Sequence, residues 1–267
     1  MKSKFFSTFL FCCLVFFVVS CTSVPITGRS QLNLVSDSTL MAQSEAQYRE
    51  FLNENTPLTG TANQAMVQRV GKKIAAAAET YFNAKGTPEV LNGFSWEFNL
   101  VKDDTPNAWC MPGGKVAVFT GILPYTKDEN GLAVVMSHEV AHAVARHGNE
   151  RVSQNMVAGL GGQVLGLATK NQSAALSQGL QKAYSVGGQM GVLLPFSRKH
   201  ESEADELGLY FMSMAGYDPR KAPEFWERMA QGGSSTPEFF STHPSDQTRI
   251  NNLNQNMPKA LEFYTGK

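Results

Sequence analysis

The sequence has few cysteines, no excess of charge of either sign and only one strongly apolar stretch. Among its 267 residues, 23 are Lys or Arg and 23 are Asp or Glu. Nucleic-acid binding calls for a basic patch, and the sequence has no such patch with interleaved aromatic residues. It also lacks internal repeats and low-complexity tracts. The length suffices for one substantial hydrophobic core or two small ones.

The apolar stretch lies at the N-terminus and is too short to be a comfortable membrane span. It covers residues 5–20, follows two lysines and ends in Val18-Val19-Ser20-Cys21. A short positive region before such a stretch is typical of a secretory signal peptide. Its end resembles a bacterial lipobox, which predicts removal of residues 1–20 and attachment of lipid to Cys21. An uncleaved anchor and an ordinary signal peptide cut nearby are the alternatives.

The residues that follow predict where the chain is held. Residues 21–36 are polar and aperiodic, so we expect a lipidated tether. Thr22 follows the lipidated cysteine, and by resemblance to enteric lipoproteins this favours the periplasmic side of the bacterial outer membrane. Two other cysteines leave with the signal peptide, so the mature chain keeps a free thiol only at Cys110. One thiol cannot form an internal disulfide, and we expect a small packed side chain there.

Helical periodicity and turn-forming residues predict mostly helices with a small β-sheet. Residues 94–101 alternate between apolar and polar side chains, as a strand with one buried face does. Residues 107–123 predict a strand, a turn at Pro112-Gly113-Gly114 and a second strand. Helices are expected at about 37–53, 62–82, from 128 onward, on both sides of Asn171 within 149–191, at about 197–216 and 218–229, and after Ser245.

The stretch HEVAHAVARH, residues 138–147, carries the strongest chemical signal in the chain. It lies in an apolar run without Pro or Gly, which predicts a helix. Positions four apart on a helix share a face, so His138 and His142 can both bind one ion through zinc–nitrogen bonds of about 2.0–2.1 Å. Glu139 lies one position round the helix and can touch a water at that ion. A polar face with solvated histidines is the alternative, but buried polar groups need partners and the neighbours here are apolar.

A third ligand is offered by the segment SRKHESEADELG, residues 197–208. Hydrolytic zinc sites usually have three protein ligands. Glu201 and Asp205 are four apart and share a helix face, so Glu201 can bind the ion while Asp205 fixes the tautomer of a ligand imidazole. The alternative is an acidic, solvated helix face, and that is our interpretation of Glu203 and Glu206.

These motifs together resemble the M48 family of zinc metallopeptidases. HEVAHAVARH precedes SRKHESEADELG, as in that family, and three further stretches agree. NAWCMPGGKVAVFTGIL is similar to the strand–turn–strand before the family's metal helix, and THPSDQTRI is similar to its C-terminal His-Pro signature. VPITGRSQL is similar to the start of the periplasmic lipoprotein members. The resemblance covers almost all of the mature chain.

The resemblance implies one zinc ion per chain. His138, His142 and Glu201 are then its ligands, and Glu139 is the general base that takes a proton from the attacking water. Asp205 is expected to support a ligand histidine from behind. The implied reaction is peptide-bond hydrolysis.

The resemblance also assigns residues outside the ligand set. Asn107 and Ala108 fall where family members expose a strand edge that pairs with the substrate backbone. His243 falls near the active site, where it either stabilises the tetrahedral oxyanion or caps the zinc in a resting state. Arg249 either orients the loop of His243 or lies on the surface. The residues expected to be structural are His147 and His200.

The chain is thus predicted to have an α+β fold, mainly α, with a gluzincin-like metallopeptidase domain at 37–267 and a small β-sheet beside the HExxH helix. The expected function is that of a zinc-dependent endopeptidase acting on unfolded or misassembled envelope proteins. Its expected partners are polypeptide substrates, the outer membrane through a lipid anchor and an envelope assembly machinery, with no nucleic acid. A metal-stabilised, chaperone-like lipoprotein with latent protease activity is the alternative. Hydrolysis of a cell-wall peptide amide is a second.

Overall fold

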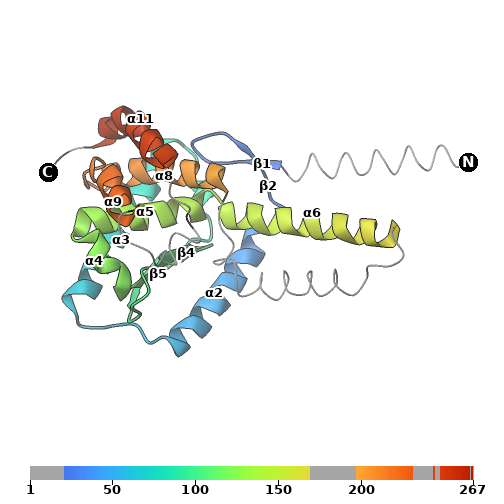
Figure 1. Cartoon of the computed structure of the whole chain (residues 1–267), viewed down its shortest axis with the longest axis horizontal. Coiled ribbons are helices and arrows are strands. Elements are labelled where there is room, and N and C mark those ends of the chain that lie inside the picture. The colour runs from blue at the N-terminus through green and yellow to red at the C-terminus, as the bar shows by residue number, and fades with distance from the viewer. Residues whose placement is uncertain (1–20, 169–196, 231–242, 244–246, 265, 267) are drawn as a thin grey trace, which may run out of the picture.

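The computed structural model describes residues 21–168, 197–230, 243, 247–264 and 266 (Figure 1). Helices dominate, and the sheets are small, as the sequence predicts. The predicted signal peptide, the expected helix after Asn171 and the expected cap at Ser245 lie outside the described residues. Within the described part of the chain, no helix combines the length and the apolar character that crossing a membrane requires.

Helix α5, Glu129–Val144, forms the centre of the molecule. It begins at Asp128, whose side chain accepts a hydrogen bond from the backbone N–H of Gly131, as the sequence predicts. Its residues from Gly131 to Val144 are all buried, because helices α3, Ala62–Ala84, and α8, Arg198–Met214, and the sheet pack around it. Polar side chains that α5 carries therefore lie in the core and need partners there.

Helix α8 packs closely against α5 because a glycine lies at the crossing point. A Cβ atom at Gly208 would lie only 3.2 Å from the backbone nitrogen of His138. Helix α8 begins at Ser197, whose hydroxyl accepts a hydrogen bond from the backbone N–H of His200. This close packing brings the acidic first turns of α8 beside the histidines of α5.

The three-stranded sheet has the order β3-β5-β4, with β3 at Glu97–Val101, β4 at Ala108–Met111 and β5 at Lys115–Phe119. Strand β5 pairs in parallel with β3 and antiparallel with β4, with Cys110 opposite Val116. Strand β3 begins later than the predicted residue 94. Its regular ladder starts where Glu97 pairs with Lys115, whereas Ser95 donates a backbone hydrogen bond to the carbonyl of Gly113 in the turn, out of that register. Strand β4 is an edge of this sheet and lies against α5.

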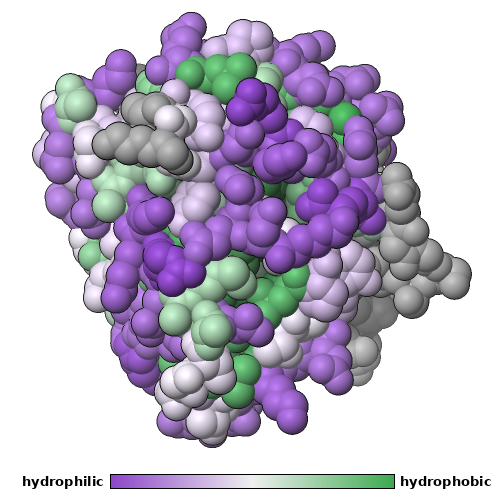
Figure 2. All heavy atoms as spheres, turned by 90° about the vertical axis from the view of Figure 1, so that its left-hand side faces the viewer, coloured by the Kyte–Doolittle hydropathy of each residue, from purple (hydrophilic) through white to green (hydrophobic). Residues whose placement is uncertain are grey.

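The remaining helices cover this centre. Helix α2, Asp37–Glu54, is capped by Ser36, whose side chain accepts a hydrogen bond from the backbone N–H of Thr39. Arg146 has a positive φ of 58°, which ends α5 and redirects the chain into α6. The other helical elements are η1 (Pro88–Leu91), η2 (Thr120–Ile122), α4 (Leu123–Thr126), α6 (His147–Ala168), α9 (Lys221–Ala230) and α11 (Gln247–Phe263). Figure 2 shows the face formed by the left-hand side of Figure 1, where polar side chains interrupt the hydrophobic areas.

The segment expected to be an aperiodic tether has structure of its own. Strands β1, Cys21–Ser23, and β2, Ser30–Leu32, pair antiparallel. The turn between them is closed by hydrogen bonds from Val24 N to Arg29 O at 2.7 Å and from Gly28 N to Val24 O at 3.0 Å. Strand β2 packs beside α6, and Val24 is 1% exposed. The hairpin is therefore packed onto the folded domain, because its apolar Val24 joins the core.

Candidate metal centre

Two histidines of α5 point to the same place in the core. The Nε2 atoms of His138 and His142 lie 3.0 Å apart, and each residue is 2% exposed. Because they are four apart on a helix, their rings leave the same face. Two buried imidazole nitrogens this close together create a strong demand for a shared partner.

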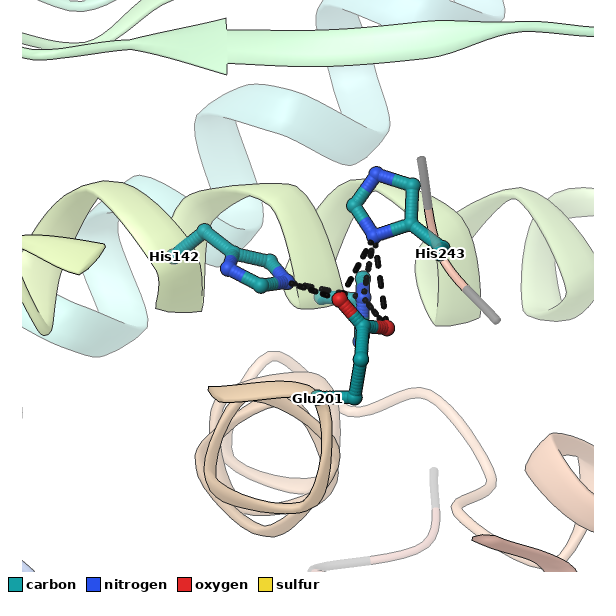
Figure 3. A group of neighbouring side chains, drawn as sticks. His142, Glu201 and His243 are labelled. Carbon is teal, nitrogen blue, oxygen red and sulfur yellow. Dashed lines mark hydrogen bonds and ion pairs between the residues drawn. The ribbon is translucent and has the colours of Figure 1, made fainter. Parts of the chain in front are cut away.

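Glu201, in the first turn of α8, brings a carboxylate to both rings. Its Oε2 atom lies 3.3 Å from His138 Nε2, and its Oε1 atom lies 3.4 Å from His142 Nε2 (Figure 3). Ligands of a tetrahedral ion with bonds of about 2.0–2.1 Å lie about 3.3 Å from one another. The nitrogen and oxygen donors and their separations therefore fit zinc, and these three residues are the ones that would hold it.

His243 adds a fourth donor to the cluster. Its Nδ1 atom lies 3.2 Å from His138 Nε2 and 3.1 Å from Glu201 Oε1. Potential ligand atoms of all four residues lie within 4.8 Å of one another. Catalytic zinc sites keep one position for water or substrate, and His243 reaches into the place that such a molecule would take.

Glu139 lies beside this cluster but is not one of its four donors. It is 2% exposed, and its Oε1 atom lies 3.3 Å from Nε2 of His243. Burial raises the pKa of its carboxyl to about 7, although His243 and Arg249 and, least of all, a hydrogen bond from the Cys110 backbone oppose that rise. A carboxyl group whose pKa lies near neutrality can both accept and return a proton, as a general base and acid must.

Asp205 and Arg249 support His138 from behind. The Oδ1 atom of Asp205 lies 2.9 Å from Nδ1 of His138. This contact places a proton on Nδ1 and leaves the Nε2 lone pair facing the cluster. Arg249 is 3% exposed and pairs with Asp205 at 2.6 Å and with Glu201 at 2.9 Å. Of the two alternatives for Arg249, the surface position is therefore wrong, because its charge is needed between two buried carboxylates.

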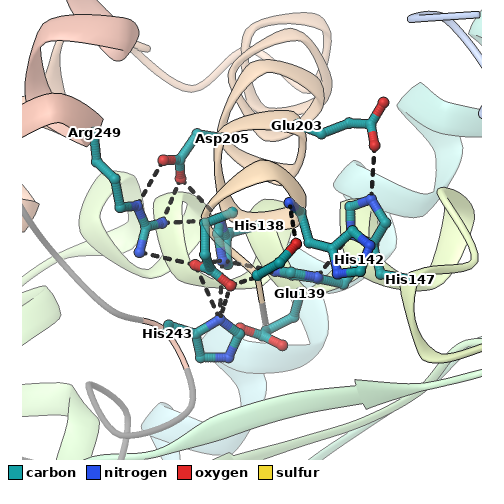
Figure 4. Close-up of polar contacts among 11 residues, drawn as sticks. His138, Glu139, His142, His147, Glu203, Asp205, His243 and Arg249 are labelled. Carbon is teal, nitrogen blue, oxygen red and sulfur yellow. Dashed lines mark hydrogen bonds and ion pairs between the residues drawn. The ribbon is translucent and has the colours of Figure 1, made fainter. Parts of the chain in front are cut away.

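His142 is supported by a residue to which the sequence assigned no role in the site. Its Nδ1 atom lies 2.9 Å from Nδ1 of His147, and Nε2 of His147 lies 3.0 Å from Oε2 of Glu203 (Figure 4). Glu203 was expected in solvent and is instead 7% exposed. Although burial would raise it, the pKa of Glu203 falls to about 2 because His147, Arg29 and Thr27 hydrogen-bond to its carboxylate.

No local pattern reveals these contacts. His147 is five positions after His142, which is not a helical pairing distance; only the break at Arg146 brings the two rings together. His200 lies next to His147, with the two rings stacked and their centroids 4.5 Å apart. Its Nε2 atom lies 3.0 Å from Oε2 of Glu150.

The residues expected at the substrate edge lie at the start of β4. Asn107 is 4% exposed, and its side-chain oxygen accepts a hydrogen bond from the backbone N–H of Ala108 at 2.8 Å. Their contact with substrate stays a prediction. Cys110 is a partly buried thiol near Glu139, and burial raises its pKa well above the usual value. A thiol held in its neutral form is a poor nucleophile, in agreement with a packing role.

Known proteins resemble the chain over most of its length. The sequence profile of peptidase family M48 matches residues 61–257. Mitochondrial metalloendopeptidase OMA1 of Schizosaccharomyces pombe is 37% identical over 252 residues, 92% of this chain and 69% of the relative. The protein of the same name in Saccharomyces cerevisiae is 33% identical, over 94% of this chain and 73% of its own. The beta-barrel assembly-enhancing protease of Escherichia coli is 26% identical, over 94% of this chain and 52% of its own.

These relatives correct one prediction made from the N-terminus. The expected localisation on the periplasmic side of a bacterial outer membrane is wrong, because the relatives above 30% identity over most of the chain are mitochondrial metalloendopeptidases. These relatives likewise give no support to three further expectations: membership of a periplasmic lipoprotein branch, the outer-membrane anchor and the envelope assembly machinery. Cleavage after residue 20 and lipid on Cys21 stay predictions from the sequence.

Proposed function

The chain belongs to peptidase family M48 and is a metalloendopeptidase, and from this premise we propose that it uses one zinc ion to cleave unfolded or misassembled polypeptides. The observation that carries the proposal is the buried cluster of His138, His142 and Glu201, whose donor atoms have the separations of a tetrahedral site. Three protein ligands of this kind, with room for a fourth group, are typical of hydrolytic zinc sites.

Glu139 and the ligand supports carry the protein's part of the chemistry. A zinc ion held by His138, His142 and Glu201 would act as a Lewis acid and would lower the pKa of a bound water toward about 7. Glu139, buried beside the cluster, accepts the proton of the attacking water and returns it to the leaving amine. Asp205 holds His138 in the tautomer that directs Nε2 toward the site.

An extended segment of polypeptide is the substrate that this site favours. Strand β4 lies at the edge of its sheet and next to α5, so an added strand would pass close to Glu139. Pairing with an edge strand requires the substrate backbone to be extended, and unfolded or misassembled chains expose such segments. The name of the Escherichia coli relative, a beta-barrel assembly-enhancing protease, fits a substrate that has not finished assembling.

The position of His243 favours a second feature of this function, namely a resting state in which its ring blocks the open position of the metal site. Its Nδ1 atom lies 3.1 Å from Glu201 and 3.2 Å from His138, where the water or the substrate carbonyl would bind. A protein held in that state would bind unfolded chains without cutting them, which is the chaperone-like alternative. Its displacement by substrate would start hydrolysis.

The test is metal analysis of the purified full chain together with mass-spectrometric mapping of cuts in a denatured protein. We expect about one zinc per chain and cuts in the denatured protein, with few in the same protein when folded. Binding of unfolded protein by both the wild type and Glu139→Gln, with cleavage by neither, would favour the chaperone. Release of peptides from purified murein would favour the cell-wall alternative. Absence of zinc from active protein would overturn the proposal.

A further inference from the structure

We propose that Thr27 and Arg29, in the turn of the N-terminal hairpin, are positioning residues of the metal centre. They act through Glu203 and His147 on the ligand His142 (Figure 4). The inference rests on the proposed function, because it assumes that His142 binds zinc.

The first step is the pairing of His142 with His147. For Nε2 of His142 to bind a metal, the proton of that neutral ring must be on Nδ1. Nδ1 of His147, 2.9 Å away, is then the acceptor. The proton of His147 is in turn on Nε2, which lies 3.0 Å from Glu203 Oε2 and donates to it. One set of tautomers therefore satisfies both contacts, from His142 to His147 and from His147 to the ionised carboxylate of Glu203.

The second step is the clamp on that carboxylate. Glu203 accepts hydrogen bonds from the hydroxyl of Thr27 and from Nε of Arg29, the latter at 2.8 Å. The same guanidinium donates to both oxygens of Glu150, at 2.9 and 2.7 Å. With these donors and His147, the position of Glu203 is fixed from the hairpin side and from the metal side. Arg29 suits this task because its planar fork can bridge two carboxylates at once.

The hairpin turn that carries these two side chains has one strained backbone position. Ile26, next to Thr27, has a φ of 73°, which is a rare conformation for a β-branched residue. Such strain persists only where the surrounding structure imposes it, and it is frequent at functional sites. Here the turn is closed by the hydrogen bond between Val24 and Arg29, and from this turn both Thr27 and Arg29 reach the same carboxylate.

The two ligand histidines therefore differ in what supports them. His138 contacts a carboxylate of α8 directly, through Asp205. The support of His142 passes through a second imidazole to a carboxylate that a segment 174 residues away in the sequence holds in place. Loss of the hairpin contacts would loosen the ring of His142 and weaken the metal site without removing a ligand. Groups that orient ligands in this way typically contribute about 10–100-fold to metal affinity or activity.

The experiment compares zinc affinity in purified full-length variants by competition with a chelator, and records the visible spectrum of the cobalt-substituted proteins. Arg29→Ala and Glu203→Gln should each raise the zinc dissociation constant about tenfold and alter the cobalt spectrum. Arg49→Ala is the matched control, because Arg49 also pairs with two glutamates, Glu45 and Glu97, but on the surface. It should leave both readouts as in the wild type.

Unchanged zinc affinity and an unchanged cobalt spectrum in Arg29→Ala would overturn the inference, whatever Glu203→Gln shows. If Arg29→Ala does not fold, Thr27→Val decides by the same criteria, since it removes one hydroxyl and keeps the shape of the side chain. The two proposals fail separately. A wild type that binds no zinc contradicts the proposed function, whereas a zinc-dependent wild type with indifferent variants contradicts only the positioning role.

Discussion

The Nδ1 atoms of His142 and His147 lie 2.9 Å apart across the junction of two helices. A continuous helix would place residues five positions apart on different faces. The left-handed backbone of Arg146, with a φ of 58°, turns the chain between them. The side chain of Arg146 is held by an ion pair of 2.7 Å with Asp37. The junction of α5 and α6 thus supplies both a proposed zinc ligand and the residue that orients it.

Glu139→Gln should keep the metal and lose the reaction. The amide has nearly the same shape as the carboxyl but cannot accept a proton, and general base catalysis contributes about 10²–10⁴-fold. We expect zinc content and melting temperature close to those of the wild type, with a rate of peptide cleavage lower by that factor. Glu224→Gln, at an exposed position on α9, is the control and should cleave normally. A fully active Glu139→Gln enzyme would remove Glu139 from the role of base.

His243→Ala distinguishes the two roles that the histidine can have. If Nδ1 caps the metal, as its distances of 3.1–3.3 Å to His138 and Glu201 indicate, removal of the ring opens the site. The initial rate of cleavage of a denatured protein should then rise. A fall in kcat of about 10²–10³-fold, with little change in KM, would instead assign His243 to the oxyanion. Zinc content measured in parallel shows whether the three remaining ligands retain the ion.

Glu150→Gln should lower stability at neutral pH and matter less in acid. Burial would raise the pKa of Glu150, but hydrogen bonds from His200 and Arg29 outweigh it and bring the value to about 2. Because an unfolded glutamate titrates near about 4.3, the carboxylate stabilises the fold above that pH and loses this effect as pH falls toward 2. Urea unfolding of the metal-free protein should show a loss of about 2 kcal/mol at pH 7 and a smaller one at pH 3. Glu54→Gln, exposed on α2, is the control and should change the free energy of unfolding little at either pH. An equal loss at both pH values for Glu150→Gln would contradict the ion-pair account.

The sequence predicts those features of the fold and of the site that depend on local periodicity, such as shared helix faces and turns. The spacing of His138 and His142 predicts that they share a helix face, as that of Glu201 and Asp205 does for a second helix. The structure places these two faces together. Turn residues likewise give the two strands around Gly113 and Gly114. Metallopeptidase activity also follows from motifs inside these elements, and the family match agrees.

Contacts between distant segments have no such periodic signal. Arg29 lies in a stretch that appears polar and aperiodic, so its packing against Glu203 could not be predicted from its neighbours. Burial of Glu203 follows from that packing, because the hairpin covers a helix face that would otherwise be solvated. The prediction of localisation failed for a different reason. It depended on the N-terminal residues up to Leu32, whereas two relatives that are 37% and 33% identical over more than nine-tenths of the chain are mitochondrial.

Gly208→Ala tests whether close helix packing sets the geometry of the metal site. An added Cβ would lie 3.2 Å from the backbone nitrogen and 3.3 Å from the Cα of His138, and backbone atoms within a buried helix cannot move away easily. The two helices must separate slightly, which also moves Glu201 away from His138 and His142. Overpacking costs about 1–3 kcal/mol, and the better helix propensity of Ala returns about 1 kcal/mol, so the net loss in the free energy of unfolding should be about 0–2 kcal/mol. Zinc affinity and kcat/KM should fall more than this small change implies.

Gly148→Ala is the control, since its Cβ would meet only Pro112 at 3.9 Å. Equal zinc affinity in the two variants would show that this helix contact does not set the ligand positions.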